Sequence, residues 1–327
     1  MKINFSIIFF VTFAAFLIGL GVIDKQRNDR KNSLKKILLE ETQKKEASLE
    51  PQVTNTPKEE IKEEPPKPAY INPPPEVNAT AFTVINLTAG KTLYKKAADQ
   101  VLPIASLTKT MTAIVALEEY DLNKGVVVPE KCTKITASRV GFKTNDVLTM
   151  EDMLYGLLVK SGADAACSIA NVGEEKEFIA KMNEKAKELG LKNTVFSNEI
   201  GFDAEESQVS SVEDIEKMTS FALKFSTFRK IVGTKSISLK SLNTPPTIYD
   251  IQNTNDLLFT IPGTVGIKTG YTEQAKGCLT YLYENKGQEI LIILLGSEDR
   301  FGDTKTILEW AGSEISLAKE QKENLGG

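Results

Sequence analysis

The chain has 327 residues, 41% of them hydrophobic, and a formal net charge of −4. This composition suits one large or two small globular domains and argues against nucleic-acid binding, which requires a basic face. The sequence contains no histidine. Every Ser-His-Asp, Cys-His and histidine-metal mechanism is therefore excluded, and a hydrolase with a side-chain nucleophile must use Lys, Asp, Glu or Tyr as its base.

The N-terminal residues 1–24 form a candidate membrane segment. No charged residue occurs from Ile3 to Ile23, and this run is long enough to cross a bilayer as a helix. We expect a retained transmembrane anchor. The alternative is a cleaved signal peptide, but the run is long for one and a small-x-small cleavage pattern is poor.

Residues 25–76 are predicted to form a charged and proline-rich linker. Eight prolines lie between Pro51 and Pro75, which excludes a helix or a central strand there. From about Val77 the composition becomes typical of a globular domain. We therefore expect the folded domain to span residues 77–315, followed by a polar tail at 316–327.

The predicted elements of this domain change type along the chain. Two strands come first, helices follow from Ser106, and two more strands and a closing helix come last. The ranges are strands at Thr80–Leu87 and Lys91–Tyr94, a helix at Ser106–Glu119, a mainly helical stretch at Met150–Phe228, strands at Gly277–Tyr283 and Glu289–Gly296, and a helix at Thr304–Trp310. This order predicts an α/β (α+β) fold, with an antiparallel sheet built from both ends of the domain and a helical subdomain inserted.

The three cysteines Cys132, Cys167 and Cys278 lie far apart and match no metal-ligand spacing. We expect no metal site and no other cofactor. The favoured interpretation of these residues is small buried apolar side chains, with one disulfide as the less favoured alternative. Their odd number leaves at least one thiol unpaired within a monomer.

Ser106 and Lys109 open the first long helix as a Ser-x-x-Lys motif. Residues three apart share one helix face, so the lysine can take the proton of the serine hydroxyl if burial or a nearby cation lowers its pKa. The N-terminus of the helix also supplies N–H groups for an oxyanion. Taken alone the motif is weak, because Ser at an N-cap followed by Lys is common.

Two further motifs strengthen the catalytic interpretation. Ser161 follows an apolar helix that breaks at Gly162, where a hydroxyl could relay a proton; the alternative is a helix N-cap. Lys268 lies in the run 266–270, Gly-Ile-Lys-Thr-Gly, where a cation could keep Lys109 neutral and attract a carboxylate; the alternative is a solvated lysine. The ordered set of three motifs in a chain without histidine favours a serine acyl-transfer enzyme.

From about Val77 to Trp310 the sequence resembles the serine D-alanyl-D-alanine carboxypeptidases, which are low-molecular-mass penicillin-binding proteins with a β-lactamase/transpeptidase-like fold. The resemblance rests on residues 105–113, Ala-Ser-Leu-Thr-Lys-Thr-Met-Thr-Ala, and 268–272, Lys-Thr-Gly-Tyr-Thr, and the stretches 148–158 and 189–194 also resemble the family. It implies hydrolysis of the terminal D-Ala-D-Ala bond of peptidoglycan stem peptides and inhibition by β-lactams.

The resemblance also assigns catalytic roles to individual residues. Ser106 becomes the acylated nucleophile, Lys109 its general base and Ser161 a proton shuttle towards the leaving amine. Backbone N–H groups of Ser106 and Tyr271 form the oxyanion hole.

The same resemblance assigns a substrate-binding group. Lys268 sets the electrostatic environment of the active site, and Thr269 binds the terminal carboxylate of the substrate. Gly270 is small enough to let the substrate backbone lie against the strand edge. Arg300 resembles an arginine that helps to hold this carboxylate, and a surface salt bridge is an equal alternative for it.

Ala163 departs from the family pattern, in which Asn occupies the third position of the Ser-x-Asn motif. The missing amide would orient Lys109 and bind the substrate backbone, so its loss costs about 1–3 kcal/mol, or ten- to a hundredfold in rate. A penicillin-binding pseudoenzyme is therefore one alternative. A serine β-lactamase is another, with Glu199 and Asp203 as the only candidates for an acidic group that activates water.

The implied substrate places the domain outside the cytoplasm, on a single-pass cell-membrane protein anchored by its N-terminal segment. The charge pattern conflicts with this expectation. Six Lys or Arg residues follow the membrane segment at positions 25–36, and the positive-inside rule alone would keep the domain in the cytoplasm.

Overall fold

The computed structural model describes residues 71–202 and 208–325, which belong to the second of two units of the chain, Pro66–Gly327. The candidate membrane segment at 1–24 and the predicted linker up to residue 70 lie outside the described residues. None of the helices in the described part has both the length and the apolar character needed to cross a membrane.

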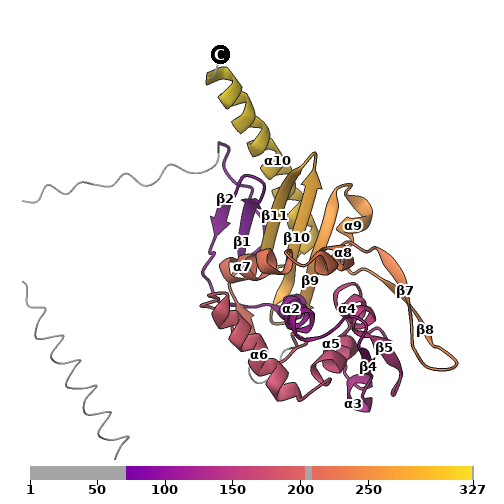
Figure 1. The fold of residues 1–327 in the computed structure, drawn as a ribbon. Helices are drawn as coiled ribbons and strands as arrows, with labels where there is room; N and C mark the ends of the chain where they lie inside the picture. The colour runs from indigo at the N-terminus through magenta and orange to yellow at the C-terminus, as the bar shows by residue number, and fades with distance from the viewer. Residues whose placement is uncertain (1–70, 203–207, 326–327) are drawn as a thin grey trace, which may run out of the picture. The chain divides into compact units, whose positions relative to one another are not determined.

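A five-stranded antiparallel sheet forms the centre of the domain (Figure 1). Its order is β2-β1-β11-β10-β9, so the two N-terminal strands join the three C-terminal ones through the β1–β11 pairing. The strands are β1 (Ala81–Asn86), β2 (Lys91–Lys96), β9 (Thr264–Thr272), β10 (Lys276–Asn285) and β11 (Gln288–Ser297). The prediction of one sheet assembled from both ends of the domain is confirmed.

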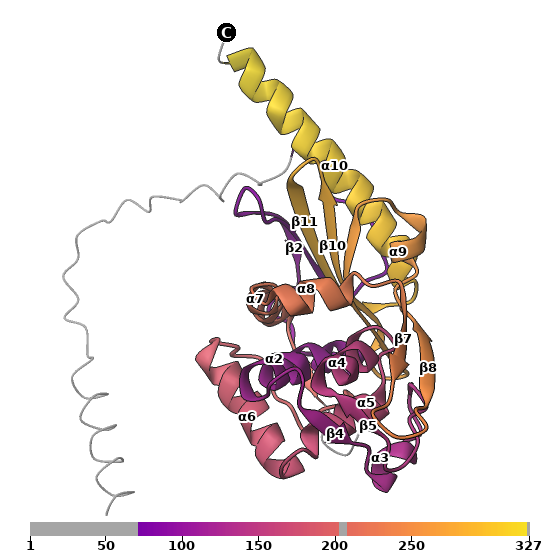
Figure 2. The same cartoon turned by 45° about the vertical axis from the view of Figure 1, so that its right-hand side comes forward.

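The central strand β11 is apolar on both faces because each face contacts its own hydrophobic core. Ile290, Ile292 and Leu294 point into one core, which they share with Trp310 of α10 (Arg300–Leu325). Leu291 and the alternate positions that follow it point into a larger core on the opposite face. The helix α10 thus covers one face of the sheet, where Leu257 of α9 (Leu257–Thr260) joins the same core, and the helical subdomain covers the opposite face, as Figure 2 shows.

The helical subdomain between the two halves of the sheet begins with a 3₁₀ turn at Ala105–Thr108, where the sequence predicted α-helix from Ser106. Its α-helices are α2 (Lys109–Glu119), α3 (Glu130–Thr133), α4 (Met150–Leu158), α5 (Ala163–Ala170), α6 (Glu175–Glu188), α7 (Val212–Ala222) and α8 (Ser226–Val232), and α9 (Leu257–Thr260) follows. Three two-stranded ribbons were not predicted: β3 (Leu102–Pro103) with β6 (Val209–Ser210), β4 (Gly125–Val127) with β5 (Val147–Thr149), and β7 (Ser236–Lys240) with β8 (Ile248–Gln252).

The closing helix α10 is longer than predicted, since it extends from Arg300 through Leu325 and includes most of the expected polar tail. Contacts with the end of the predicted linker explain part of this extension. The Glu314 carboxylate accepts the N–H groups of Ile71 and Asn72, the latter at 2.7 Å, and Trp310 Nε1 donates to the Asn72 carbonyl at 3.3 Å. The folded body therefore begins before the predicted boundary at Val77.

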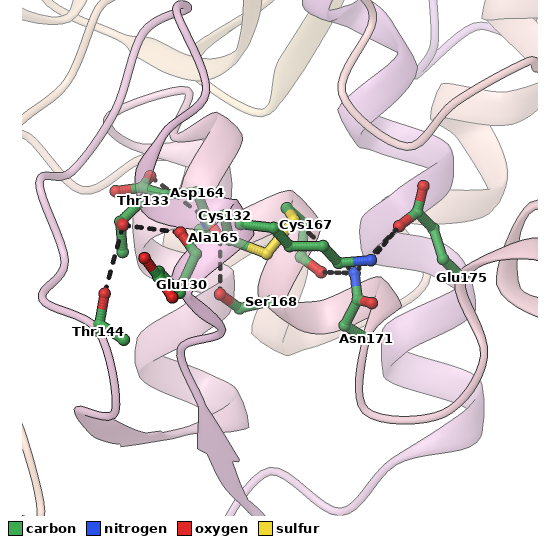
Figure 3. The surroundings of a disulfide bond; sticks show 11 residues. Glu130, Cys132, Thr133, Thr144, Asp164, Ala165, Cys167, Ser168, Asn171 and Glu175 are labelled. Atoms are coloured by element: carbon green, nitrogen blue, oxygen red, sulfur yellow. Dashed lines mark hydrogen bonds and ion pairs between the residues drawn. A yellow bond between two sulfur atoms is a disulfide. The ribbon is translucent and has the colours of Figure 1, made fainter.

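Cys132 of α3 and Cys167 of α5 form a disulfide, so the favoured prediction of unbonded thiols is wrong for these two residues (Figure 3). They are 35 positions apart, and only the packing of α3 against α5 brings their Cα atoms to 5.5 Å. Cys278 is buried in β10 and takes no part in this bond.

Candidate active site

Ser106 lies in the 3₁₀ turn that leads into α2, and its side chain is partly exposed. The N-cap of this turn is Ile104 and that of α2 is Thr108, so the alternative role of Ser106 as a helix cap is excluded. Ala105, just before it, has φ +46°, a left-handed conformation that is costly for a residue with a Cβ and is typical of functional sites. The turn presents the Ser106 hydroxyl to Lys109, whose Nζ lies 3.0 Å from Oγ.

Lys109 is buried, with 1% of its surface exposed. Burial lowers the pKa of its amine from 10.5 to about 7, and the negative charges of Glu199 and Asp164 oppose that shift. The Nζ atom also donates a hydrogen bond of 2.5 Å to the carbonyl oxygen of Ile200. An amine with a pKa near neutrality, within hydrogen-bond distance of a hydroxyl, is suited to act as a general base.

Ser161 occupies the break between α4 and α5 and has φ +60°. The N-cap of α5 is Gly162, so Ser161 is not a capping residue either. Its Oγ accepts a hydrogen bond of 2.9 Å from Nζ of Lys268. The structure thus joins two of the predicted motifs through one direct contact.

The buried carboxylate of Asp164 stabilises the break between α4 and α5 through hydrogen bonds. Asp164 has no exposed surface and accepts hydrogen bonds from four backbone N–H groups. Three of the donors belong to the segment from Val140 to Phe142, at 2.8–3.1 Å, and the fourth is Ala165 at 3.0 Å. One carboxylate therefore fastens the 140–142 segment to the start of α5, beside Ser161.

Lys268 to Tyr271 lie on β9, the edge strand of the sheet nearest the helical subdomain. Lys268 is 1% exposed, so the alternative of a solvated lysine is wrong. Burial lowers the pKa of its amine well below the usual value, and the positive charges of Lys109 and Arg300 add to that effect. A substrate carboxylate would supply the counter-charge that this site lacks.

Two glycines allow the backbone to approach Ser106 closely from both sides. A Cβ at Gly270 would lie 3.2 Å from the Ser106 nitrogen. A Cβ at Gly201, whose φ is +81°, would lie 2.1 Å from the Ala105 carbonyl oxygen, closer than any real contact. The edge of β9, with the exposed Tyr271 after Gly270, therefore borders the nucleophile directly.

Hydroxyl and guanidinium groups lie next to this strand edge. The hydroxyls of Thr269 and Thr254 are 2.7 Å apart, and Arg300 Nη1 donates to the Gly270 carbonyl at 3.3 Å. The ion pairs of the described residues do not include Arg300, which argues against its alternative role as a surface salt bridge. Hydroxyl donors beside two cationic side chains are a suitable environment for a carboxylate.

Ala163 is completely buried and offers no side-chain acceptor to Lys109. The sequence did not predict the two groups that the structure adds here, the Ile200 carbonyl and the Thr254 hydroxyl. A backbone carbonyl has no sequence signature, and a single threonine distant from every motif gives no signal.

Of the two acidic residues considered as activators of water, Glu199 is 2% exposed, and burial raises the pKa of its carboxyl. Asp203 lies outside the described residues.

Residues 68–299 match the family model of peptidase family S11, D-alanyl-D-alanine carboxypeptidase. The chain belongs to this family. Sequence similarity to a D-alanyl-D-alanine carboxypeptidase of Bacillus subtilis agrees, with 34% identity over 256 residues. That match covers 75% of this chain and 65% of the relative, less than two thirds of its length. A D-alanyl-D-alanine carboxypeptidase of Streptomyces sp. K15 is 34% identical over 70% of this chain and 84% of its own length.

The fold of this S11 family member is also similar to a solved structure. The crystal structure of the Streptomyces K15 DD-transpeptidase shares 32% identity with a TM-score of 0.70, covering 74% of this chain and all of the other. The family resemblance and the fold class predicted from the sequence are therefore confirmed, and so is a serine peptidase at the level of the family.

Proposed function

We propose that this chain is a serine D-Ala-D-Ala carboxypeptidase that trims peptidoglycan stem peptides through an acyl-enzyme on Ser106. One observation carries the proposal: Lys109, with a pKa of about 7, lies 3.0 Å from the Ser106 hydroxyl in a chain that has no histidine. Neutral at physiological pH, this amine accepts the hydroxyl proton as Ser106 Oγ attacks the carbonyl carbon of the penultimate D-Ala.

The developing oxyanion is stabilised by backbone N–H groups at the strand edge. The N–H groups of Ser106 and Tyr271 are the proposed donors, and the close approach of Gly270 to the Ser106 nitrogen supports this pairing. When the peptide bond breaks, the leaving D-Ala amine takes a proton from Lys109 by way of Ser161. Water then hydrolyses the ester on Ser106.

The terminal carboxylate of the substrate is the proposed ligand of Thr269, Lys268 and Arg300. Burial and the positive charges of Lys109 and Arg300 lower the pKa of the Lys268 amine well below its usual value. Because a carboxylate favours the ammonium form, substrate binding and proton uptake by Lys268 reinforce each other. This requirement selects substrates with a C-terminal carboxylate, as a carboxypeptidase needs.

A penicillin-binding pseudoenzyme is the second candidate, because Ala163 removes an amide that the family motif normally provides. A serine β-lactamase is supported less well. It needs an acidic group in contact with water, and Glu199 is almost completely buried.

We further propose that the domain lies outside the cytoplasm on an N-terminal membrane anchor. The Cys132–Cys167 disulfide supports this location, since disulfides persist in oxidising compartments and are rare in the cytosol. The substrate class supports it as well.

Two measurements on the same protein separate these candidates. Intact-mass analysis after β-lactam treatment is expected to show one adduct in the native protein and none in Ser106→Ala. Release of D-Ala from a D-Ala-D-Ala peptide is then expected from the native protein. An adduct without D-Ala release would favour the pseudoenzyme, rapid loss of the adduct with ring-opened drug would favour the β-lactamase, and an adduct on another serine would contradict the assignment of Ser106.

A further inference from the structure

A turn that borders the active site is held together by the side chain of Asn198. The Asn198 Oδ1 atom accepts hydrogen bonds from the N–H groups of Ile200, Gly201 and Phe202, at 3.1, 2.8 and 3.4 Å. Its Nδ2 donates to the Phe202 carbonyl at 3.2 Å. Such Asn-centred bonds fix a turn that has no helix or strand to support it.

This turn packs against the face of α2 that carries Lys109. Two consecutive carbonyl groups of the turn accept hydrogen bonds from side chains of α2. The Glu199 carbonyl accepts from the Thr112 hydroxyl at 2.7 Å, and the Ile200 carbonyl accepts from Lys109 Nζ at 2.5 Å. Lys109 and Thr112 are three apart and therefore share that face.

The next residue of the turn fixes the distance to the nucleophile. Gly201 packs so closely that a Cβ there would lie 2.1 Å from the Ala105 carbonyl oxygen. The turn thus has one defined position relative to both Ser106 and Lys109.

Building on the proposed acylation of Ser106, we propose that Asn198 is a positioning residue for Lys109: it holds the turn whose Ile200 carbonyl replaces the amide missing at Ala163 as an acceptor for the lysine amine. A neutral amine has two N–H bonds and one lone pair. With one N–H bound to Ile200, the lone pair can face the Ser106 hydroxyl 3.0 Å away. When Lys109 becomes an ammonium during attack, the same carbonyl stabilises the new charge.

Loss of the Asn198 side chain is expected to lower the Lys109 pKa. Glu199 and Asp164 raise the pKa of this amine, and Lys268 faces it from β9. Asp164 and Lys268 lie outside the turn, whereas Glu199 belongs to it, so withdrawal of Glu199 with the turn would lower the pKa in the same direction as loss of the carbonyl. A carbonyl acceptor favours the ammonium form, so displacement of the Ile200 carbonyl lowers the Lys109 pKa further below its native value of about 7.

The test is an NMR titration of the full-length chain labelled with ¹³Cε-lysine, in which the Lys109 signal is identified by its loss in Lys109→Arg. In Asn198→Ala we expect the Lys109 pKa to fall by about one pH unit and acylation by a fluorescent penicillin to slow roughly tenfold at saturation, with little change in drug affinity. Asn198→Asp keeps the acceptor oxygen and is expected to retain a pKa at or above the native one.

Asn183 on α6 provides a matched control. Its side chain also makes three backbone hydrogen bonds, one to Ile179 and two to Phe196, which lies two positions before Asn198. Asn183→Ala is expected to lower the thermal midpoint and leave the Lys109 pKa unchanged.

The same shift in Asn183→Ala, or an unchanged pKa in Asn198→Ala, would overturn the proposal. Should Asn198→Ala not fold, Asn198→Ser is used, since its shorter side chain cannot reach all three N–H groups, and the same direction is expected. The titration requires no turnover, so a native protein that forms no adduct contradicts the proposed function without deciding the role of Asn198.

Discussion

Nζ of Lys268 and Oγ of Ser161, 107 positions apart in the chain, are joined by a hydrogen bond of 2.9 Å. This bond links the edge strand β9 to the break between α4 and α5, two segments that contribute residues to the candidate active site. Lys268 also donates to its neighbouring Thr269 carbonyl at 2.9 Å. One buried amine therefore holds the proposed proton shuttle and the proposed carboxylate site in register.

Replacement of Lys268 should affect acylation more than folding. Lys268→Ala removes the cation that faces the substrate carboxylate and leaves Ser161 without this donor. We expect kcat/KM for a D-Ala-D-Ala peptide to fall at least about a hundredfold, as for loss of a buried charge-assisted contact. Lys268→Arg, which keeps the charge, should lose less. Equal activity of native and Lys268→Ala proteins would show that Lys268 is not part of the site.

The pH dependence of acylation reports on Lys109. Because the pKa of this amine is lowered to about 7, the base is neutral above that pH and protonated below it. The rate of acylation by a fluorescent penicillin should therefore fall about tenfold per pH unit below pH 7 and level off above it. A rate that still rises between pH 8 and pH 10 would indicate an unshifted lysine.

Ala163→Asn tests whether the missing amide limits the rate. If Asn there adds an acceptor for Lys109 and a contact to the substrate backbone, acylation should accelerate, up to about tenfold. The fully buried position makes packing the main risk, so thermal stability has to be measured in parallel. A folded Ala163→Asn variant that is slower than an already fast native enzyme would mean that another group, such as the Ile200 carbonyl, has taken over this role.

The Cys132–Cys167 bond should stabilise the helical subdomain. It closes a loop with a sequence separation of 35 residues, for which loop entropy gives about 3–4 kcal/mol. We expect the Cys132→Ala/Cys167→Ala variant to unfold at lower denaturant concentration by that amount, with the same dependence on denaturant. A reducing agent should have no effect on this double variant, which makes it the control for reduction of the native protein.

The location of the domain can be read from a reporter fused after Gly327. We expect an enzyme that is active only outside the cytoplasm, such as alkaline phosphatase, to be active in this fusion, because the proposed substrate lies there. Activity of a cytoplasmic reporter in its place would show that the basic residues at 25–36 determine the orientation and that the proposed location is wrong.

The sequence by itself determined the chemistry and the general fold. The lack of histidine left lysine as the most suitable base, and the spacing of Ser106 and Lys109 placed them within reach because residues three apart meet on a helical turn. The apolar runs of β10 and β11 and the strand-helix-strand order were sufficient to predict the sheet. These features are local, so the pattern of neighbouring residues contains them.

Only the tertiary structure decided which distant groups complete the site. The Ile200 carbonyl that binds Lys109 belongs to the backbone, so the identity of the residue at this position does not predict the contact. The pairing of Cys132 with Cys167 depends on how α3 packs against α5, and the length of α10 depends on contacts between Glu314 and the segment that begins at Ile71. Each of these contacts joins residues that are far apart in the chain, so burial and packing, which local sequence does not specify, determine them.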